Sequence, residues 1–194
     1  MVRWYHAIFT AYGFWLPNDP RGSRSTFIAS WNLLRFGNAT TTSERRSVAH
    51  RPHDRADRFA AKETLRYPPV RFDSHQRELI ATGIARACEE SAIIVHACAI
   101  GWDHVHAVIG RHEHSVERVV GHLKTRATQA LLAAAQHPFA RYHAPPLPSP
   151  WARKCWSVFI DDESQLGAAI QYVRAHPMKE GLPAQHWDFV TPYR

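Results

Sequence analysis

Two histidines separated by one residue lie in a run of β-forming residues, the segment DHVHAVI at positions 103–109. Side chains alternate along a strand, so His104 and His106 point to the same face, about 7 Å apart at a rise of about 3.3 Å per residue. Neutral imidazole is a common ligand of divalent metal ions. Two imidazoles so placed can bind one ion and leave coordination positions for a third protein group and for the oxygens of a phosphate.

The alternative is that this His-x-His pattern is incidental, since the chain contains 14 histidines. Its setting favours a site, because the pair follows an apolar stretch and two polar rings on one face of a buried strand need a partner. The sequence therefore predicts that His104 and His106 share a ligand, and it does not by itself supply the third one.

A second pair of reactive groups lies in the segment DESQLGAAIQYVRAH at positions 162–176. Its periodicity predicts a helix with Leu166, Ile170 and Val173 on the core face. Tyr172 and His176 are four residues apart, so they are neighbours on a different face of that helix. Two readings stay open: Tyr172 could simply pack at the sheet edge, and His176 could be an exposed C-terminal cap favoured by the helix dipole.

The remaining elements must position these groups. The pattern predicts strands at 3–12, 92–101, 104–110 and 154–160, a helix after the Asp73-Ser74 cap, a second after Ser115, and a proline-rich connection at 137–150. The third helix is capped by Asp161 or Asp162 and is expected to end near His176, because Pro177 disfavours helical geometry before it. This order predicts an α+β, ferredoxin-like sandwich, an antiparallel sheet with helices packed on one face.

The segment from about 15 to 72 interrupts this order. It has no sustained period and carries eleven Lys and Arg residues against five Asp and Glu residues. We interpret it as a long basic N-terminal insertion of loops with a short helix inside one domain spanning 1–194. The whole chain has a formal net charge of +7, which favours a polyanionic partner.

Composition excludes several classes. With 45% hydrophobic residues the chain can build a core, and no apolar run is long enough to span a membrane. Cys88, Cys98 and Cys155 form no CxxC pair, so buried reduced thiols are expected rather than a zinc or redox centre. These features predict a cytoplasmic protein.

Three stretches together resemble the REP-associated tyrosine transposases, relatives of the single-tyrosine HUH transposases. They are DHVHAVI, the early GFWLPNDPRG, and PWARKCWSVFIDDESQLGAAIQYVRAHPMKEGLPAQHW. The resemblance implies that His104 and His106 are metal ligands and Tyr172 is the nucleophile. His176 stands where that family usually has Asn, and would supply the third ligand; a histidine there shifts the preference from Mg²⁺ toward Mn²⁺, Zn²⁺ or Ni²⁺.

The activity implied by the resemblance is single-strand DNA cleavage and strand transfer through a 5′-phosphotyrosine intermediate, with Mg²⁺ or Mn²⁺ as cofactor. The substrate would be single-stranded or hairpin DNA of repetitive elements, bound by a monomer or homodimer. Aromatic and basic residues can stack bases and contact phosphates, and the candidates are Trp15, Arg21, Arg24, Lys124 and Arg126.

Three alternatives remain. One is a DNA-binding protein of the same fold without catalysis, and another is a plasmid replication initiator or relaxase. The third is a zinc hydrolase that uses His104 and His106 with His112 or His114.

Overall fold

The computed structural model describes residues 3–23, 25–42, 48, 51–142 and 146–193. Its centre is a four-stranded antiparallel sheet in the order β2-β3-β1-β4. The strands are β1 (Trp4–Ala11), β2 (Val95–Ile100), β3 (His104–Gly110) and β4 (Trp151–Ile160). The two central strands, β1 and β3, are those that carry the first aromatic run and the histidine pair. The α+β fold with an antiparallel sheet is confirmed.

Three long helices begin where their capping residues predict. In α3 (Ser74–Ser91), the Asp73 side chain and Gln76 form a capping box. In α4 (Val116–Ala133), Ser115 accepts a hydrogen bond from the Arg118 N–H. In α5 (Glu163–Lys179), Asp162 accepts from two backbone N–H groups. A 3₁₀ turn, η1 (Ala140–Tyr142), lies in the proline-rich connection.

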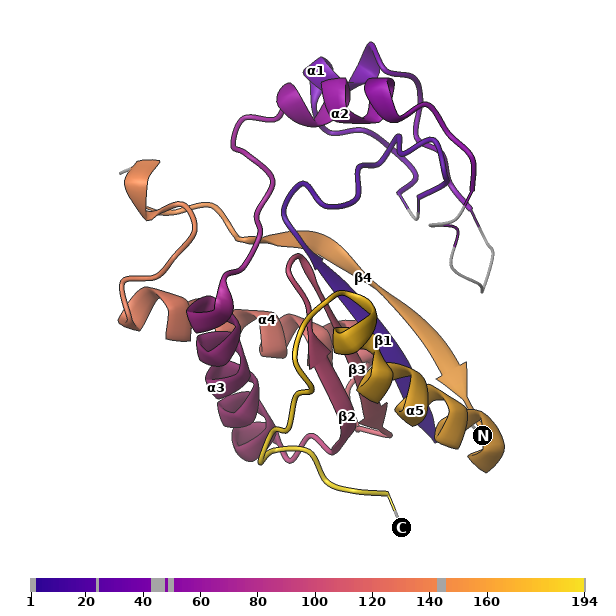
Figure 1. Cartoon of the computed structure of the whole chain (residues 1–194), viewed down its shortest axis with the longest axis vertical. Coiled ribbons are helices and arrows are strands. Elements are labelled where there is room, and N and C mark those ends of the chain that lie inside the picture. The colour runs from indigo at the N-terminus through magenta and orange to yellow at the C-terminus, as the bar shows by residue number, and fades with distance from the viewer. Residues whose placement is uncertain (1–2, 24, 43–47, 49–50, 143–145, 194) are drawn as a thin grey trace. The chain divides into compact units, whose positions relative to one another are not determined.

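The helices cover both faces of the sheet, so the expectation of helices on one face is wrong. Phe9 contacts Trp151, whose indole N–H donates to Thr128 of α4, so α4 and its partner α3 lie on the Phe9 face. The opposite face packs against α5 in a cluster of Trp4, Ala97, Ala99, Val108, Ile160, Leu166, Ile170 and Val173. Figure 1 shows α5 lying across the sheet. Strands β2 and β3 are buried at every residue. They therefore lack the polar–apolar alternation that distinguishes a sheet with one solvent-exposed face from a sheet covered by helices on both faces.

Helix α5 also runs further than expected. It continues to Lys179 with Pro177 inside it, so the predicted end near His176 is wrong. Proline removes one backbone hydrogen bond donor from a helix, but the next turn still closes, because the Glu180 N–H donates to the carbonyls of His176 and Pro177. One more helical turn therefore follows His176 and places Glu180 on the same side of the helix.

The chain divides into two compact units, Met1–Ala11 with Arg71–Arg194, and Tyr12–Val70. The second unit corresponds closely to the interpreted insertion. It has its own small core of Leu16, Leu33 and Ala61, built from α1 (Trp31–Leu34), α2 (Arg55–Glu63) and the loop before them. The part expected to be loops with one short helix thus contains two helices packed on a loop.

The three cysteines are free. Cys88 and Cys98 are buried as expected, and Cys155 is half-buried. Within the described ranges, none of the helices has the length and apolar character required to cross a bilayer.

Candidate functional site

The histidines at 104, 106 and 176 meet on the α5 face of the sheet. Strand β3 points His104 and His106 to that face, and α5 brings His176 over them, with the Nε2 atoms of His104 and His176 only 2.8 Å apart. The rings of His106 and His176 have centroids 4.2 Å apart. One ligand nitrogen from each of the three residues lies within 4.8 Å of the others, so they could hold one metal ion.

A fourth histidine, His6, belongs to the same assembly and is absent from the sequence prediction. It lies on β1 beside β3, and its Nε2 is 2.9 Å from the Nδ1 of His106. A histidine that binds a metal through Nε2 commonly donates its Nδ1–H to a neighbouring acceptor, which fixes the ring. His6 is placed to accept that hydrogen bond. Only the β1–β3 register, which the sequence does not give, brings the two rings together.

Acidic groups border the histidines on the side of the β2–β3 turn. The Asp103 Oδ1 lies 2.9 Å from the Nδ1 of His104. The Glu180 Oε1 lies 3.6 Å from the Nε2 of His104 and 3.7 Å from that of His176. Asp103 can therefore orient His104 through the nitrogen that faces away from His176, and Glu180 was missed because the helix was expected to end before it.

Burial keeps three imidazoles of this site neutral, those of His6, His106 and His176. Burial lowers the pKa of His6 to about 4, and burial, then the charges of His104, Lys179 and His6, lower the pKa of His176 to about 4. Burial and the three neighbouring histidines hold the pKa of His106 well below 6.5. Neutral imidazole is the form that binds a metal, so these rings are ready to act as ligands at neutral pH.

Tyr172 lies beside this cluster and is 41% exposed. Its ring centroid is 5.6 to 5.8 Å from those of His6, His106 and His176. Burial and the carboxylate of Glu180 raise the pKa of the Tyr172 phenol, while the Lys179 ammonium lies 4.8 Å from the ring centroid. The phenol is therefore protonated at neutral pH, accessible from outside, and one helical turn from His176, all within a single chain.

One buried polar atom supports a cation at this site. The Oε2 of Glu180 has no hydrogen-bond partner among the described residues. Unpaired buried polar atoms are uncommon in folded proteins and call for an explanation such as an ion. Three imidazoles with an adjacent carboxylate suit a divalent transition metal, so the residues fit such an ion.

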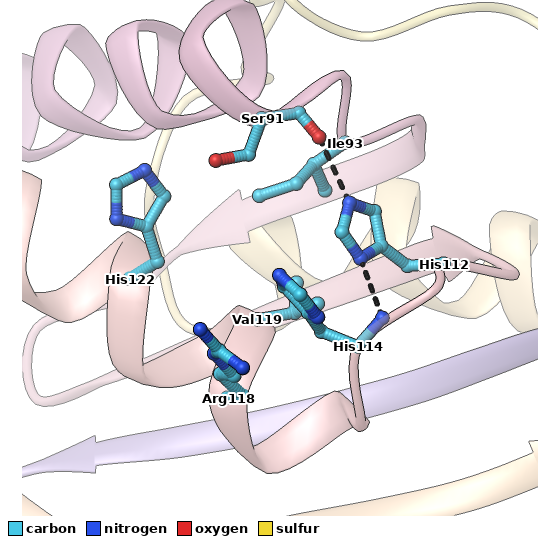
Figure 2. Close-up of a pocket in the computed structure, with 7 residues that line it drawn as sticks. All are labelled: Ser91, Ile93, His112, His114, Arg118, Val119 and His122. Atoms are coloured by element: carbon cyan, nitrogen blue, oxygen red, sulfur yellow. Dashed lines mark hydrogen bonds between the residues drawn. The ribbon is translucent and has the colours of Figure 1, made fainter.

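His112 and His114, the extra ligands of a zinc hydrolase, lie elsewhere, after the opposite end of β3. Figure 2 shows them in a pocket of about 160 Å³ lined also by Ser91, Ile93, Arg118, Val119 and His122. The backbone N–H of His114 donates to His112 Nδ1, so the His112 Nε2–H donates to the Ser91 carbonyl at 2.8 Å. Both ring nitrogens of His112 are occupied, and the hydrolase ligand set is not assembled among the described residues.

The predicted DNA contacts Trp15 and Arg21 form one structural unit in the Tyr12–Val70 part. Arg21 is buried and makes two hydrogen bonds of 2.8 Å to the Asp19 carboxylate. Its guanidinium lies 3.9 Å from the Trp15 ring centroid, and the Trp15 indole N–H donates to the Gly22 carbonyl. The residues of the motif GFWLPNDPRG therefore contact one another and stabilise the conformation of their own loop. Arg24 lies outside the described residues.

The other two candidates, Lys124 and Arg126, lie on α4, on the face of the sheet opposite Tyr172. The Lys124 Nζ is buried and donates to the carbonyls of Ala152 and Lys154. Burial lowers the pKa of Lys124 to about 8. Arg126 pairs with Glu90 at 2.6 Å. Both side chains make their contacts within the protein, and we propose neither of them as a DNA contact.

No protein-family model and no curated protein matches the chain. The structure is similar to a solved structure of a REP-associated tyrosine transposase bound to a REP hairpin, with a TM-score of 0.47 and 11% sequence identity, over 94% of this chain and 70% of that one. A similarity at this level does not define function, which depends on the site.

Proposed function

We propose that this chain is a metal-dependent single-strand DNA endonuclease and strand transferase with Tyr172 as its nucleophile. One observation carries the proposal: three histidines from β3 and α5 converge within 4.8 Å beside a partly exposed tyrosine on α5. A divalent ion held by His104, His106 and His176 would polarise the scissile phosphate and stabilise charge on the leaving oxygen.

The residues of the chain supply the rest of the reaction. The Tyr172 oxygen attacks phosphorus in line, forming an Oη–P bond as the P–O3′ bond breaks. The phenolic proton is lost and the departing 3′ oxygen gains one, so the products are a 5′-phosphotyrosine and a free 3′-hydroxyl. A second 3′-hydroxyl can reverse the step and rejoin a strand.

The substrate we propose is single-stranded DNA next to a hairpin of a repetitive element. This rests on the sequence motifs shared with the REP-associated tyrosine transposases and on the basic composition of the chain, with 24 Lys and Arg residues against 17 Asp and Glu. A phosphate in an unpaired strand can be turned toward a helix-borne nucleophile, whereas one in a stacked duplex is held in place.

The test is covalent capture. End-labelled single-stranded oligonucleotides carrying the repetitive hairpins that flank the gene are incubated with protein and Mn²⁺ or Mg²⁺, then analysed under denaturing conditions. We expect a protein–DNA band that is lost in Tyr172→Phe and with chelator. Tyr5→Phe is the matched control, since Tyr5 lies on the other face of β1 against Phe159. A band that survives Tyr172→Phe would contradict the nucleophile assignment.

A DNA-binding protein of the same fold without catalysis gives a different result. It would retard the hairpin oligonucleotide in a native gel and yield no covalent band with any divalent metal. Tyr172→Phe would then leave every measurable property of the protein on DNA unchanged.

A further inference from the structure

Three polar side chains occupy one face of α5 at intervals of four residues: Tyr172, His176 and Glu180. The spacing places them in successive turns of the helix, one above the other. Tyr172 and His176 already belong to the candidate site. Glu180, one turn further, lies with its Oε1 3.6 Å and 3.7 Å from the Nε2 atoms of His104 and His176. Those two nitrogens are themselves 2.8 Å apart, so the three potential ligand atoms lie within 3.7 Å of one another.

The other carboxylate oxygen of Glu180 is buried and has no hydrogen-bond partner among the described residues. The backbone opposite it is a glycine, Gly101, in the turn after β2. A Cβ added at Gly101 would lie 2.6 Å from this Oε2 atom, which is closer than such atoms approach. Gly101 has no positive φ angle, so the backbone conformation does not require glycine there. The small residue leaves room for the carboxylate beside the histidines.

We propose that Glu180 is a fourth protein ligand of the metal ion bound by His104, His106 and His176. The inference rests on the proposed function, because it concerns the same ion. Three imidazoles and one carboxylate form a mixed nitrogen and oxygen set, which suits Mn²⁺ or Zn²⁺. Mg²⁺ prefers oxygen ligands and retains most of its water. The three imidazoles thus make the site selective for a transition metal, and the carboxylate cancels one of the two positive charges of the ion.

Two simpler roles for Glu180 predict different behaviour. As the C-cap of α5, it acts through its backbone N–H, which donates to the carbonyls of His176 and Pro177 and is unaffected by a side-chain substitution. As an ion-pair partner of His104, it would stabilise only the metal-free protein, so its removal would strengthen metal binding rather than weaken it. Neither of these two roles predicts weaker metal binding when the carboxylate is removed.

The experiment is a Mn²⁺ titration of the full chain, followed by the electron paramagnetic resonance signal of the free ion, and a parallel Zn²⁺ titration by calorimetry. We expect Glu180→Gln to weaken Mn²⁺ binding by at least about tenfold, the lower end of the effect of losing even an indirect metal contact. Glu163→Gln is the matched control, because Glu163 is an exposed residue in the first turn of the same helix. Its affinity should match that of the wild type.

Two further variants keep the result interpretable. Gly101→Ala should weaken Mn²⁺ binding to a similar extent by displacing the carboxylate, and Glu180→Asp should fall between the wild type and Glu180→Gln. Far-UV circular dichroism and urea unfolding in chelator check that each variant folds. Glu180→Gln protein that is folded and binds Mn²⁺ within twofold of the wild type would overturn the inference while leaving the three-histidine site intact. Wild-type protein that binds neither ion would overturn the proposed function as well.

Discussion

The Nε2 atom of His6 lies 2.9 Å from the Nδ1 atom of His106, so a residue of the first strand orients a candidate metal ligand a hundred positions later in the chain. The two strands β1 and β3 are adjacent and central in the sheet, which makes the relation between these rings as rigid as the sheet itself.

Replacing His6 should weaken metal binding while the fold survives. His6→Leu removes the acceptor for His106, and loss of such an outer contact typically lowers metal affinity by about 10- to 100-fold. His6→Gln keeps an oxygen acceptor and should recover most of the affinity. The measurement is a Mn²⁺ or Zn²⁺ titration of both variants. Equal affinities for the two variants and the wild type would mean that His6 does not position His106.

Acid should destabilise the metal-free protein between about pH 6.5 and pH 4. The folded-state pKa values of His6 and His176 are lowered to about 4 from 6.5. In this interval the unfolded chain therefore binds more protons than the folded one, and the free energy of unfolding falls as pH decreases. His6 alone would contribute up to about 3 kcal/mol.

Urea midpoints in chelator at pH 7, 5.5 and 4.5 measure this effect. The decrease should be smaller in His6→Gln than in the wild type. Wild-type midpoints that stay constant over this range would contradict the lowered pKa values.

Lys124 should behave as a core residue. Its Nζ donates to the Ala152 and Lys154 carbonyls, so Lys124→Met should change affinity for a hairpin oligonucleotide by less than about twofold, as expected for a group that neutralises no phosphate. Burial lowers its pKa from 10.5 to about 8. The unfolded chain binds more protons between these values, so stability should rise with pH from about 8 to 10.5, and Lys124→Met should abolish that rise. Gel shifts and urea unfolding at pH 8 and pH 10 test both statements.

Arg21 should hold the Tyr12–Val70 unit together. Removing one partner of a buried ion pair leaves an uncompensated charge and costs about 3–5 kcal/mol, and Arg21→Ala would leave the Asp19 carboxylate, which has no exposed side-chain surface, without its partner. We expect this unit to become sensitive to limited proteolysis, with Arg35→Ala at an exposed position as control. Resistance equal to that of the wild type would show that the pair contributes little.

The sequence predicts best what depends on local periodicity. Alternation along a strand is enough to place His104 and His106 on one face, and helical spacing is enough to place Tyr172 next to His176. Capping residues such as Asp73 and Ser115 give the helix starts for the same reason. Each of these relations involves residues within about one turn or one strand, so no knowledge of the tertiary fold is needed.

The features that the sequence did not predict depend mostly on contacts between residues far apart in the chain. His6 reaches His106 only through the order of the strands, and the position of α5 opposite α3 and α4 cannot be read from strands that are buried on both faces. Glu180 was missed for a different reason, because Pro177 was expected to end the helix. The loop around Arg21 lacks any period, yet its ion pair and the Trp15 ring give it a fixed structure.

The two faces of β3 have different roles, one in the candidate metal site and the other in the hydrophobic core. His104 and His106 point to α5, whereas Val105 and Ala107 are buried on the side of α3 and α4. On that side, Gly83 allows the backbone of α3 to contact Ala127 of α4. One seven-residue strand thus carries two residues of the candidate metal site on one face and residues of the hydrophobic core on the other. Repacking the interior, by mutation or by adaptation to a new temperature, would shift the histidines with it, so in this fold thermal adaptation and metal chemistry are not free to evolve independently.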